Sequence, residues 1–518
     1  MSNTNEILIK IKDATLHGQL TVNEIPITDI KELVITEAAT ILGNMSSDYI
    51  ELKKLCNNFP NTCTDKNKII NFLDSLIAYT IKISDAALTN IIELPDNITP
   101  DDEYMYYLKL SEQYIHNKDQ YYLCLENAAY HCKNLTEKEH ILTQLDEIND
   151  NTDLNIQPTS IVIISYNNLY LTQKCVESIR NTCPVNSYEI IVVDNASSDN
   201  VINWLSQQPD INLICNNENM GFPKGCNIGI ANSKQYNDIF LLNNDTRLTP
   251  NALFWLRMGL YNEENIGATG AICNYIGNQQ FIDLFYTSIS DYQRFGYVNN
   301  QYRTNSMELS TTLSGFAMLI KRNALNKTTL LDETLTPGYY EDDDICLQLM
   351  QLGYKLYVCH NSFIYHAGSQ SFGKLKSDAI TNIFICNQNY MFKKWGFHPD
   401  NNHLSKNIYD TFNNSKIIIH KHITLLEINA HTGATYAHLK YIYSDMNYIG
   451  LENNKNYLPC MLENVIYIDC SYEKYHYNIH NFNYVIINDS DNYSITQKEQ
   501  LLTSIQPHLS SDAYVLWN

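Results

Sequence analysis

Four short apolar runs between residues 160 and 243 constrain the fold of this chain more than any other feature. They read SIVIIS, YEIIVVD, INLICN and DIFLLN, and segments of helical character separate them. Continuous apolar runs of this length, alternating with helices, are typical of parallel strands covered by helices on both faces. The sequence therefore predicts an α/β domain with a mainly parallel sheet.

The segments between the runs carry helix signals. In LTQKCVESIR the apolar residues share one helical face. Further along, the pair Thr249-Pro250 predicts a helix with Thr249 as its N-cap and Pro250 at its first position.

Two further regions flank this domain, which extends over residues 156–400. Residues 1–155 contain few glycines, and after the strand-like opening EILIKIK their apolar residues recur at helical spacing, which predicts a helical domain. The acidic, Asn-rich stretch around Pro158 separates the two regions. From 415 to 518 apolar strands and helices alternate again, so we expect a second, shorter α/β domain with a truncated Rossmann-like fold.

The charge of the chain limits its partners. With 35 basic and 57 acidic residues the formal net charge is −22, which disfavours binding to nucleic acid or to anionic lipid. The 14 cysteines form no C-x-x-C pair, so we expect reduced thiols and no zinc site. No apolar run reaches the roughly 18 residues of a membrane span. We expect a cytoplasmic protein that associates with a membrane only peripherally, through a partner.

Polar residues follow the apolar runs where the strands end. Ligands of parallel α/β sheets bind beyond the carboxyl ends of the strands, so these residues are candidates for nucleotide contact. A carboxylate there can accept from a base or a ribose, and a second can hold a cation that bridges a diphosphate. The alternative is a local role in turns and caps, which Asn and Asp favour. The candidates are Ser165, Tyr166, Asn167, Asp194, Asn195, Asp199, Asn243, Asn244 and Asp245.

A glycine-rich turn, NENMGFPKGCNIGI at 217–230, leads into a helix. Glycines allow a backbone to approach a phosphate or a sugar, and a helix N-terminus favours anions. Asn219, Gly221, Lys224 and Asn227 are therefore further candidates for donor contact. Glycine-rich turns are also common in α/β proteins without such a ligand.

Four acids at 341–344 precede a short amphipathic helix that Gly353 closes. Acids in a first helical turn can simply cap the helix and interact with its dipole. Four adjacent carboxylates also repel one another, which raises the pKa of at least one toward a range that suits a general base. His366, directly after the apolar run SFIY, is a candidate metal contact.

The order and spacing of seven blocks resemble those of an inverting family 2 glycosyltransferase with the GT-A fold. The blocks are VIISYNN, IIVVDNASSD, NMGFPKGCNIG, FLLNNDT, LSGFAMLIKR, YYEDDDICLQLMQLGYKLYV and YHAGSQSF. The resemblance covers residues 158–398. It implies that Ser165 and Asp194 hold a nucleoside and that Asp245, in the D-x-D position, binds Mn²⁺ or Mg²⁺ with His366 as an auxiliary contact. Asn243 replaces the first acid of that motif, as in the rhamnosyltransferase-like branch.

The resemblance also implies an acceptor side. Gly315 and Phe316 would line the pocket for the donor sugar or the acceptor, and Asp342 would be the general base, with Glu341 and Asp344 as competitors. One base is enough, because a nucleoside diphosphate leaves readily once a cation neutralises its oxygens. The base removes the acceptor proton while the oxygen attacks the face opposite the diphosphate, which inverts the anomeric configuration.

The C-terminal region resembles the Rossmann-like methyltransferases that use S-adenosylmethionine, through LLEINAHTG, YIGLENN and VIINDS. Asn429 and His431 stand where glycine normally lets the backbone approach the cofactor, and Gly433 alone remains. Glu452 is placed to meet a ribose. The chain ends before the final strands of that fold, so the resemblance implies a degenerate or scaffolding domain without S-adenosylmethionine.

The leading hypothesis is a metal-dependent sugar transferase that uses a nucleoside-diphosphate sugar and a hydroxyl of a saccharide or protein, such as a surface polysaccharide or a flagellin-like acceptor. The alternatives are a non-catalytic assembly protein, a sugar methyltransferase and a nucleotidyltransferase. The assembly protein is disfavoured because Asp245, Asp342 and His366 are intact. The altered glycine loop argues against a methyltransferase, and the acidic block argues against a nucleotidyltransferase. The sequence leaves the donor and the acceptor open.

Overall fold

A computed structural model describes residues 2–16, 26–42, 47–89, 100–284, 286, 288–368, 377–412, 422–477 and 481–518. Residues 369–372 of the YHAGSQSF block and residues 415–421, at the expected start of the C-terminal domain, lie outside these ranges. Contacts divide the chain into two units, one of residues 1–103 with 283–298 and one of residues 104–282 with 299–518.

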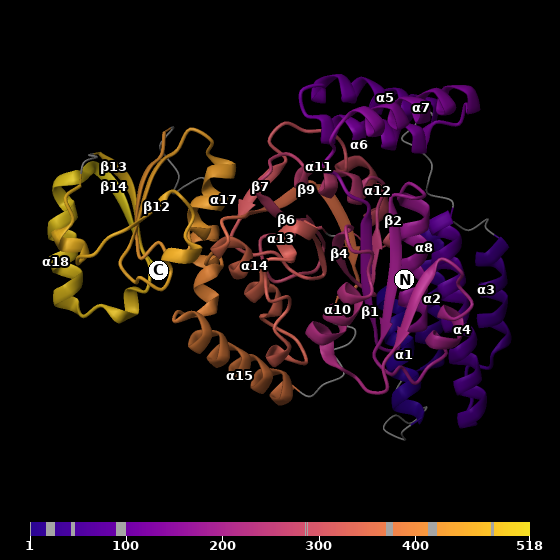
Figure 1. The fold of residues 1–518 in the computed structure, drawn as a ribbon. Helices are drawn as coiled ribbons and strands as arrows, with labels where there is room; N and C mark the ends of the chain where they lie inside the picture. The colour runs from indigo at the N-terminus through magenta and orange to yellow at the C-terminus, as the bar shows by residue number, and fades with distance from the viewer. Residues whose placement is uncertain are drawn as a thin grey trace. The chain divides into compact units, whose positions relative to one another are not determined.

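The first unit is helical. It contains α1 (Ser2–Leu16), α2 (Ile27–Leu42), α3 (Ser47–Asn58), α4 (Lys66–Thr89) and most of α12 (Ile289–Asn299). Helices α1 to α4 pack side by side (Figure 1) around a core that includes Leu8, Leu52 and Leu73. The strand-like reading of EILIKIK is wrong, because this segment is part of α1 and its Leu8 is buried in the helical core.

The second unit contains a nine-stranded sheet with the order β3-β2-β1-β4-β8-β6-β9-β5, in which β7 also pairs with β9. The four apolar runs form β1 (Thr159–Ser165), β2 (Tyr188–Asp194), β3 (Ile211–Cys215) and β4 (Asp238–Asn243), which pair in parallel. The other strands are β5 (Thr246–Leu248), β6 (Ile266–Ile272), β7 (Met307–Ser310), β8 (Ala317–Ile320) and β9 (Lys355–His366). β5, β7 and β8 run antiparallel to their neighbours. The predicted mainly parallel α/β sheet is thus confirmed.

Helices cover both faces of the parallel strands. α8 (Leu169–Thr182) packs Cys175 into the core that contains Ile161. On the opposite face, α10 (Gly221–Ala231) lies so close to β1 that a Cβ atom on Gly229 would be 2.3 Å from Cγ1 of Val162. Gly225 lies against Ile164 in the same way. These two glycines of the glycine-rich turn therefore allow close packing of the helix on the sheet.

The helix predicted to begin at Pro250 starts two residues later. α11 (Ala252–Leu260) has Asn251 as its N-cap, with a left-handed φ of 62°. The hydroxyl of Thr249 donates to the carbonyl of Phe363 and accepts from Nδ2 of Asn300 at 2.8 Å. The predicted boundary is wrong because this hydroxyl bonds residues outside the helix instead of capping it.

Three helices before the sheet belong to the second unit from Tyr104 onward. They are α5 (Pro100–Ser111), α6 (Lys118–His131) and α7 (Leu135–Asn151). Tyr107 shares a hydrophobic core with Phe254 of α11, and Nε2 of Gln120 donates to the carbonyl of Met258 at 2.8 Å. The later helices of the predicted N-terminal helical region therefore pack on the sheet.

The remaining α-helices that precede the C-terminal sheet are α9 (Val201–Leu205), α13 (Arg322–Leu325), α14 (Glu341–Gln351), α15 (Ser377–Trp395) and α16 (Lys406–Phe412). The C-terminal elements are β10 (Thr424–Ile428), α17 (Ala434–Ile442), β11 (Asn447–Glu452), β12 (Val465–Tyr467), β13 (Phe482–Ile487), α18 (Ile495–Ile505) and β14 (Leu509–Trp517). No described helix has the length and apolar character that a bilayer span requires.

The C-terminal strands form a separate sheet of order β12-β11-β10-β13-β14, in which every pair is parallel. α18 covers one face and α16 and α17 cover the other (Figure 1). This strand order is the Rossmann-like arrangement expected for the region, and the order reverses at β10.

Replacing Gly229 with Ala should destabilise the second unit by roughly 1–3 kcal/mol, the usual range for overpacking a core, because the new methyl group collides with Val162. The change can be measured by urea unfolding. Gly277→Ala is the matched control, since a Cβ there meets nothing within 4 Å. Equal stability of the two variants would contradict the close packing of α10 on β1.

Candidate active site

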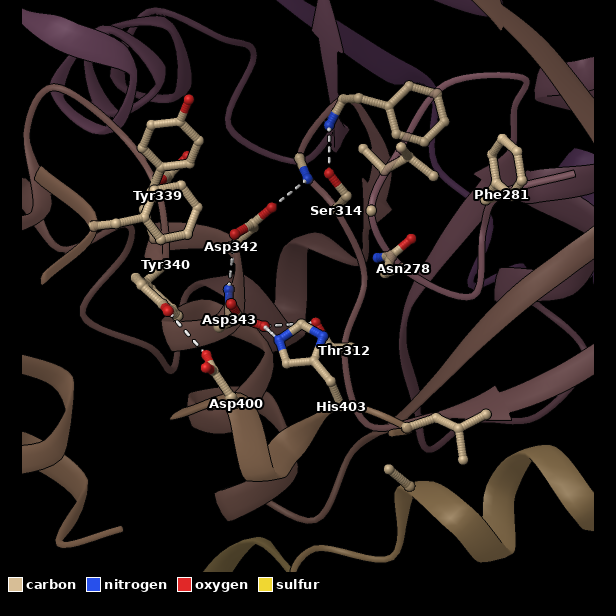
Figure 2. A pocket seen from close by; sticks show the side chains of 18 of the residues that line it. Asn278, Phe281, Thr312, Ser314, Tyr339, Tyr340, Asp342, Asp343, Asp400 and His403 are labelled. Carbon is tan, nitrogen blue, oxygen red and sulfur yellow. Dashed lines mark hydrogen bonds and ion pairs between the residues drawn. The ribbon is translucent and has the colours of Figure 1, made fainter. Parts of the chain in front are cut away.

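A cavity of about 1650 Å³ opens at the carboxyl ends of β1 and β4. The start of α14 and the segment from Asp400 to Ser405 form further walls (Figure 2). The lining continues to loops of the C-terminal sheet, around residues 430 and 490. A cavity of this size exceeds the usual range for a single small ligand.

The cavity gathers most of the residues that the sequence singled out. Those that line it are Tyr166, Asn195, Asn219, Gly221, Asn243, Asn244, Asp245, Gly315, Phe316, Glu341, Asp342 and His366. Those outside its lining are Ser165, Asn167, Asp194, Asp199, Lys224, Asn227 and Asp344.

Several of the outlying polar residues bond to neighbouring loops. Asp194 accepts from the backbone N–H and the hydroxyl of Ser197, at 2.8 and 2.5 Å. The same hydroxyl oxygen accepts from the backbone N–H of Asn167 at 2.7 Å. Nδ2 of Asn227 donates to the carbonyl of Leu331 at 2.8 Å. These contacts hold the loops that follow β1 and β2 and attach residue Leu331 to α10, which is the structural role that Asn and Asp often take.

Antiparallel pairing of β5 with β9 places Asp245 beside His366, because Thr246 faces His366 in register. Nδ1 of His366 donates to the carbonyl of Tyr275 at 2.7 Å, and the ring of Phe316 stacks on the imidazole. These contacts turn Nε2 toward Oδ1 of Asp245, 3.3 Å away. Burial alone would lower the pKa of His366, but Asp245 outweighs it and raises the pKa to about 10.

The first turn of α14 carries four carboxylates, two of which form no ion pair with any residue that the structure describes. Glu341 is buried, and its Oε2 has no hydrogen-bond partner among the described residues. Asp342 is half-buried in the cavity wall, where Oδ2 accepts from the backbone N–H of Gly315 at 3.2 Å (Figure 2).

Cations compensate the other two carboxylates. Oδ1 of Asp343 lies 2.8 Å from Nε2 of His403, a contact that Figure 2 marks. Asp344 is fully buried, and its Oδ1 lies 2.7 Å from Nζ of Lys394 on α15. Asp344 therefore points away from the cavity, whereas Asp343 remains in its lining.

Comparison with protein families identifies the domain that contains Asp245 and Gly315. The sequence profile of glycosyl transferase family 2 matches residues 160–329. These residues form a family 2 glycosyltransferase domain. The match includes Asp245 and Gly315, whereas α14 and His366 follow it in the chain.

Three solved structures illustrate the likeness. GalNAc-T7 with UDP, GalNAc and Mn²⁺ has 16% identity and a TM-score of 0.34 over 41% of this chain and 44% of its own. The mannosyltransferase PcManGT from Pyrobaculum calidifontis, in complex with GDP-Man and Mn²⁺, has 13% identity and a TM-score of 0.32 over 52% of this chain and 69% of its own. TarS 1–349 from S. aureus has 12% identity and a TM-score of 0.31 over 46% of this chain and 72% of its own.

This chain thus spans less than half the length of GalNAc-T7 in that comparison. A search of curated proteins gave no match.

The acids beside the glycosyltransferase domain differ in proton affinity. Burial and the charge of Asp343 raise the pKa of Asp342 to about 6, although the Gly315 N–H and His403 act in the opposite direction. Burial, with a smaller effect of Asp342, raises the pKa of Glu341 well above its usual value. At Asp343 burial is outweighed by His403, so its pKa is lowered. Asp342 is therefore the cavity acid whose charge changes near neutral pH.

Sequence reasoning did not single out His403 or Lys394. Both follow the family 2 match, and neither belongs to a local motif. The acidic block itself carried a signal, because four adjacent buried or half-buried carboxylates require cations from elsewhere in the chain. The acidic block therefore predicts that cationic side chains pair with it, but it does not indicate which residues these are.

Replacing His403 with Gln should make the stability of the second unit less dependent on pH. Asp343 outweighs burial and raises the pKa of His403 to about 9, above the unfolded value near 6.5. The stabilisation is therefore fully present below pH 6.5 and is lost as the pH rises through 9. We expect the variant to be less stable by about 2 kcal/mol at pH 7 and nearly equal to wild type at pH 10.

Urea unfolding at several pH values measures this difference. His422→Gln is the control, because His422 is exposed and pairs only with Asp445. A His403→Gln deficit that stays constant from pH 6 to pH 10 would show that the imidazole carries no charge in the folded protein.

Proposed function

We propose that the chain transfers a sugar from a nucleoside-diphosphate sugar to a hydroxyl of a saccharide or protein, with inversion and with a divalent cation. The observation that carries the proposal is the presence of Asp342 and the Asp245–His366 pair in the walls of one cavity beside a family 2 glycosyltransferase domain. The carboxylate suits proton removal and the pair suits a cation, and the reaction needs both.

The Asp245–His366 pair fits Mn²⁺ or Mg²⁺. Nδ1 of His366 carries a proton because it donates to a carbonyl, so Nε2 is the nitrogen that would offer a lone pair, after losing the proton that Asp245 favours there. Its distance of 3.3 Å from Oδ1 of Asp245 is close to the roughly 3 Å between neighbouring ligands whose bonds to the ion are about 2.1 Å. When bound, the cation neutralises the diphosphate and makes it a better leaving group.

Ligands beyond this pair would come from the donor. The described residues contain no group of three or more His, Cys, Asp or Glu side chains suited to a metal. Diphosphate oxygens and water would therefore complete the coordination, as is common for Mg²⁺ in sites that bind phosphates. Such a site would hold the ion and the nucleotide together.

Asp342 is the proposed general base. Its carboxylate takes the acceptor proton while the acceptor oxygen bonds to the anomeric carbon and the bond from that carbon to the diphosphate breaks. Burial raises the pKa of Glu341 well above its usual value, which disfavours the carboxylate form that a base needs, and Asp344 bonds Lys394 outside the cavity. The lowered pKa of Asp343 makes it the weaker base.

The donor nucleotide would lie between the tips of β1 and β4. Tyr166 is 39% exposed there and offers its ring to a base. Asn195 donates through Nδ2 to the carbonyl of Gly221 at 3.0 Å, which fixes the start of α10 at the cavity. In this proposal Ser165 and Asp194 support the nucleoside pocket through the loops that they hold.

Asp245→Asn should reduce Mn²⁺-dependent release of nucleoside diphosphate by at least about 100-fold, because the pair loses its charged ligand. The assay uses a panel of UDP-, dTDP- and GDP-sugars with Mn²⁺, with and without EDTA. Asp199→Asn is the control, because Asp199 also lies in a loop after a strand but outside the cavity, and Asn keeps an acceptor oxygen for the backbone N–H of Val201. Release that is insensitive to EDTA in wild type would contradict the metal site. Failure of every donor would favour a non-catalytic assembly role.

Asp342→Asn should lower kcat by about 10²–10⁴-fold, the usual contribution of a general base, while donor binding persists. Wild-type kcat should rise with pH through about 6 and then level off, because the base must be ionised. Glu341→Gln is the matched control, since it makes the same carboxylate-to-amide change at the neighbouring acid of the same helical turn. If Glu341→Gln loses as much activity as Asp342→Asn, the assignment of the base is wrong.

A further inference from the structure

The C-terminal sheet has a crevice at the point where its strand order reverses. β11 lies on one side of β10 and β13 lies on the other. In open parallel sheets ligands bind outside the carboxyl ends of the strands at such a point. The loops that follow β10 and β13 both line the large cavity, through His431 and through Asn488 and Asp489.

These two loops are tied to each other. Nδ2 of Asn429 donates to the carbonyl of Asn488 at 2.9 Å, and Nε2 of His431 lies 2.9 Å from Oδ2 of Asp489. The backbones of Asn429, His431 and Asp489 are left-handed, with φ of 53°, 52° and 54°. Non-glycine residues in this region cost conformational energy, and such residues gather at ligand sites. The crevice therefore has a fixed shape before any ligand arrives.

The crevice does not suit a nucleoside cofactor. Glu452, which would meet a ribose, is 2% exposed and accepts from the backbone N–H groups of His431 and Asn454. A Cβ on Gly433 would meet Val465 and Leu462, so this glycine faces the sheet interior and leaves no approach for a ligand. Neither residue lines the cavity.

The wall between this crevice and the proposed base is rich in carboxylates, and its histidine His403 is paired with Asp343. Asp400 and His403 line the cavity beside Asp343 (Figure 2), and Nδ2 of Asn401 lies 3.3 Å from Nε2 of His431. Farther along, Asp491 is exposed in the same cavity. Carboxylates accept hydrogen bonds from hydroxyl groups and repel phosphate.

We propose that this crevice is an acceptor subsite that binds an uncharged oligosaccharide, whose reacting hydroxyl reaches Asp342 through the Asp400–His403 segment. The proposal rests on the proposed function and names its acceptor class. An oligosaccharide offers hydroxyl donors along its whole length, and these match acceptor oxygens from Asp342 to Asp491. A phosphate-bearing glycan would be repelled along the same path.

The test uses a panel of neutral oligosaccharides two to six sugars long, the same glycans carrying phosphate, and hydroxyl-bearing peptides. Asp491→Asn should raise the KM for a neutral oligosaccharide about tenfold and leave the KM for the donor within twofold, since the lost charge lies far along the acceptor path. Asp489→Asn, which also faces His431, should act in the same direction. Asp469→Asn should change neither constant, because Asp469 is exposed outside the cavity.

Unchanged acceptor KM in both variants would overturn the proposal, as would a preference for phosphorylated glycans or for peptides. Saturation-transfer NMR of the wild type with the neutral panel provides a second measurement, and absence of binding there would also overturn it. Hydrolysis of the donor by the wild type, with water in place of an acceptor, tests the proposed function separately. If the donor is hydrolysed but no oligosaccharide binds or reacts, the proposed function holds and only the acceptor subsite is wrong.

Discussion

Charge compensation at the start of α14 is the interaction on which the rest of the site depends. Four consecutive carboxylates occupy one helical turn, and the helix dipole stabilises each by only about 0.3–1 kcal/mol. The structure gives each acid a different environment. Glu341 is buried, Asp342 accepts from a backbone N–H, Asp343 pairs with a histidine and Asp344 pairs with a lysine. Because the partners differ, so do the pKa values, and one carboxylate is left both accessible and basic.

The cationic partners of these acids, His403 and Lys394, come from segments that follow the family 2 match, so the site is completed by the C-terminal part of the chain. Asn402 is central to this arrangement. It accepts through its carbonyl from the hydroxyl of Thr311 at 2.7 Å, and its side chain donates to the carbonyl of Thr311 at 2.8 Å. Its Oδ1 also accepts from Thr432 at 2.7 Å. This buried amide thus anchors the turn that carries His403 to both sheets of the second unit.

The sequence alone predicts the strands and their polar ends well, because continuous apolar runs have few alternatives. It does not distinguish what the polar residues do. Asp194 and Asp245 both follow a strand, yet one bonds Ser197 three residues away and the other faces His366 across the β5–β9 pair. The difference depends on a long-range antiparallel pairing that no local pattern encodes. His403 could not be predicted from the sequence for the same reason, because its contact with Asp343 is also long-range.

The loop after β10 illustrates how side chains at left-handed positions shape a site. Asn429 and His431 keep the left-handed conformation that glycine would adopt freely, but their side chains bond the loop after β13. Where glycine would leave space for a ligand to approach the main chain, these side chains present a polar wall. Hydroxyl-rich ligands need such a wall, whereas a phosphate needs exposed backbone N–H groups. In the acceptor subsite that we propose, the polar wall of this loop would therefore favour a sugar.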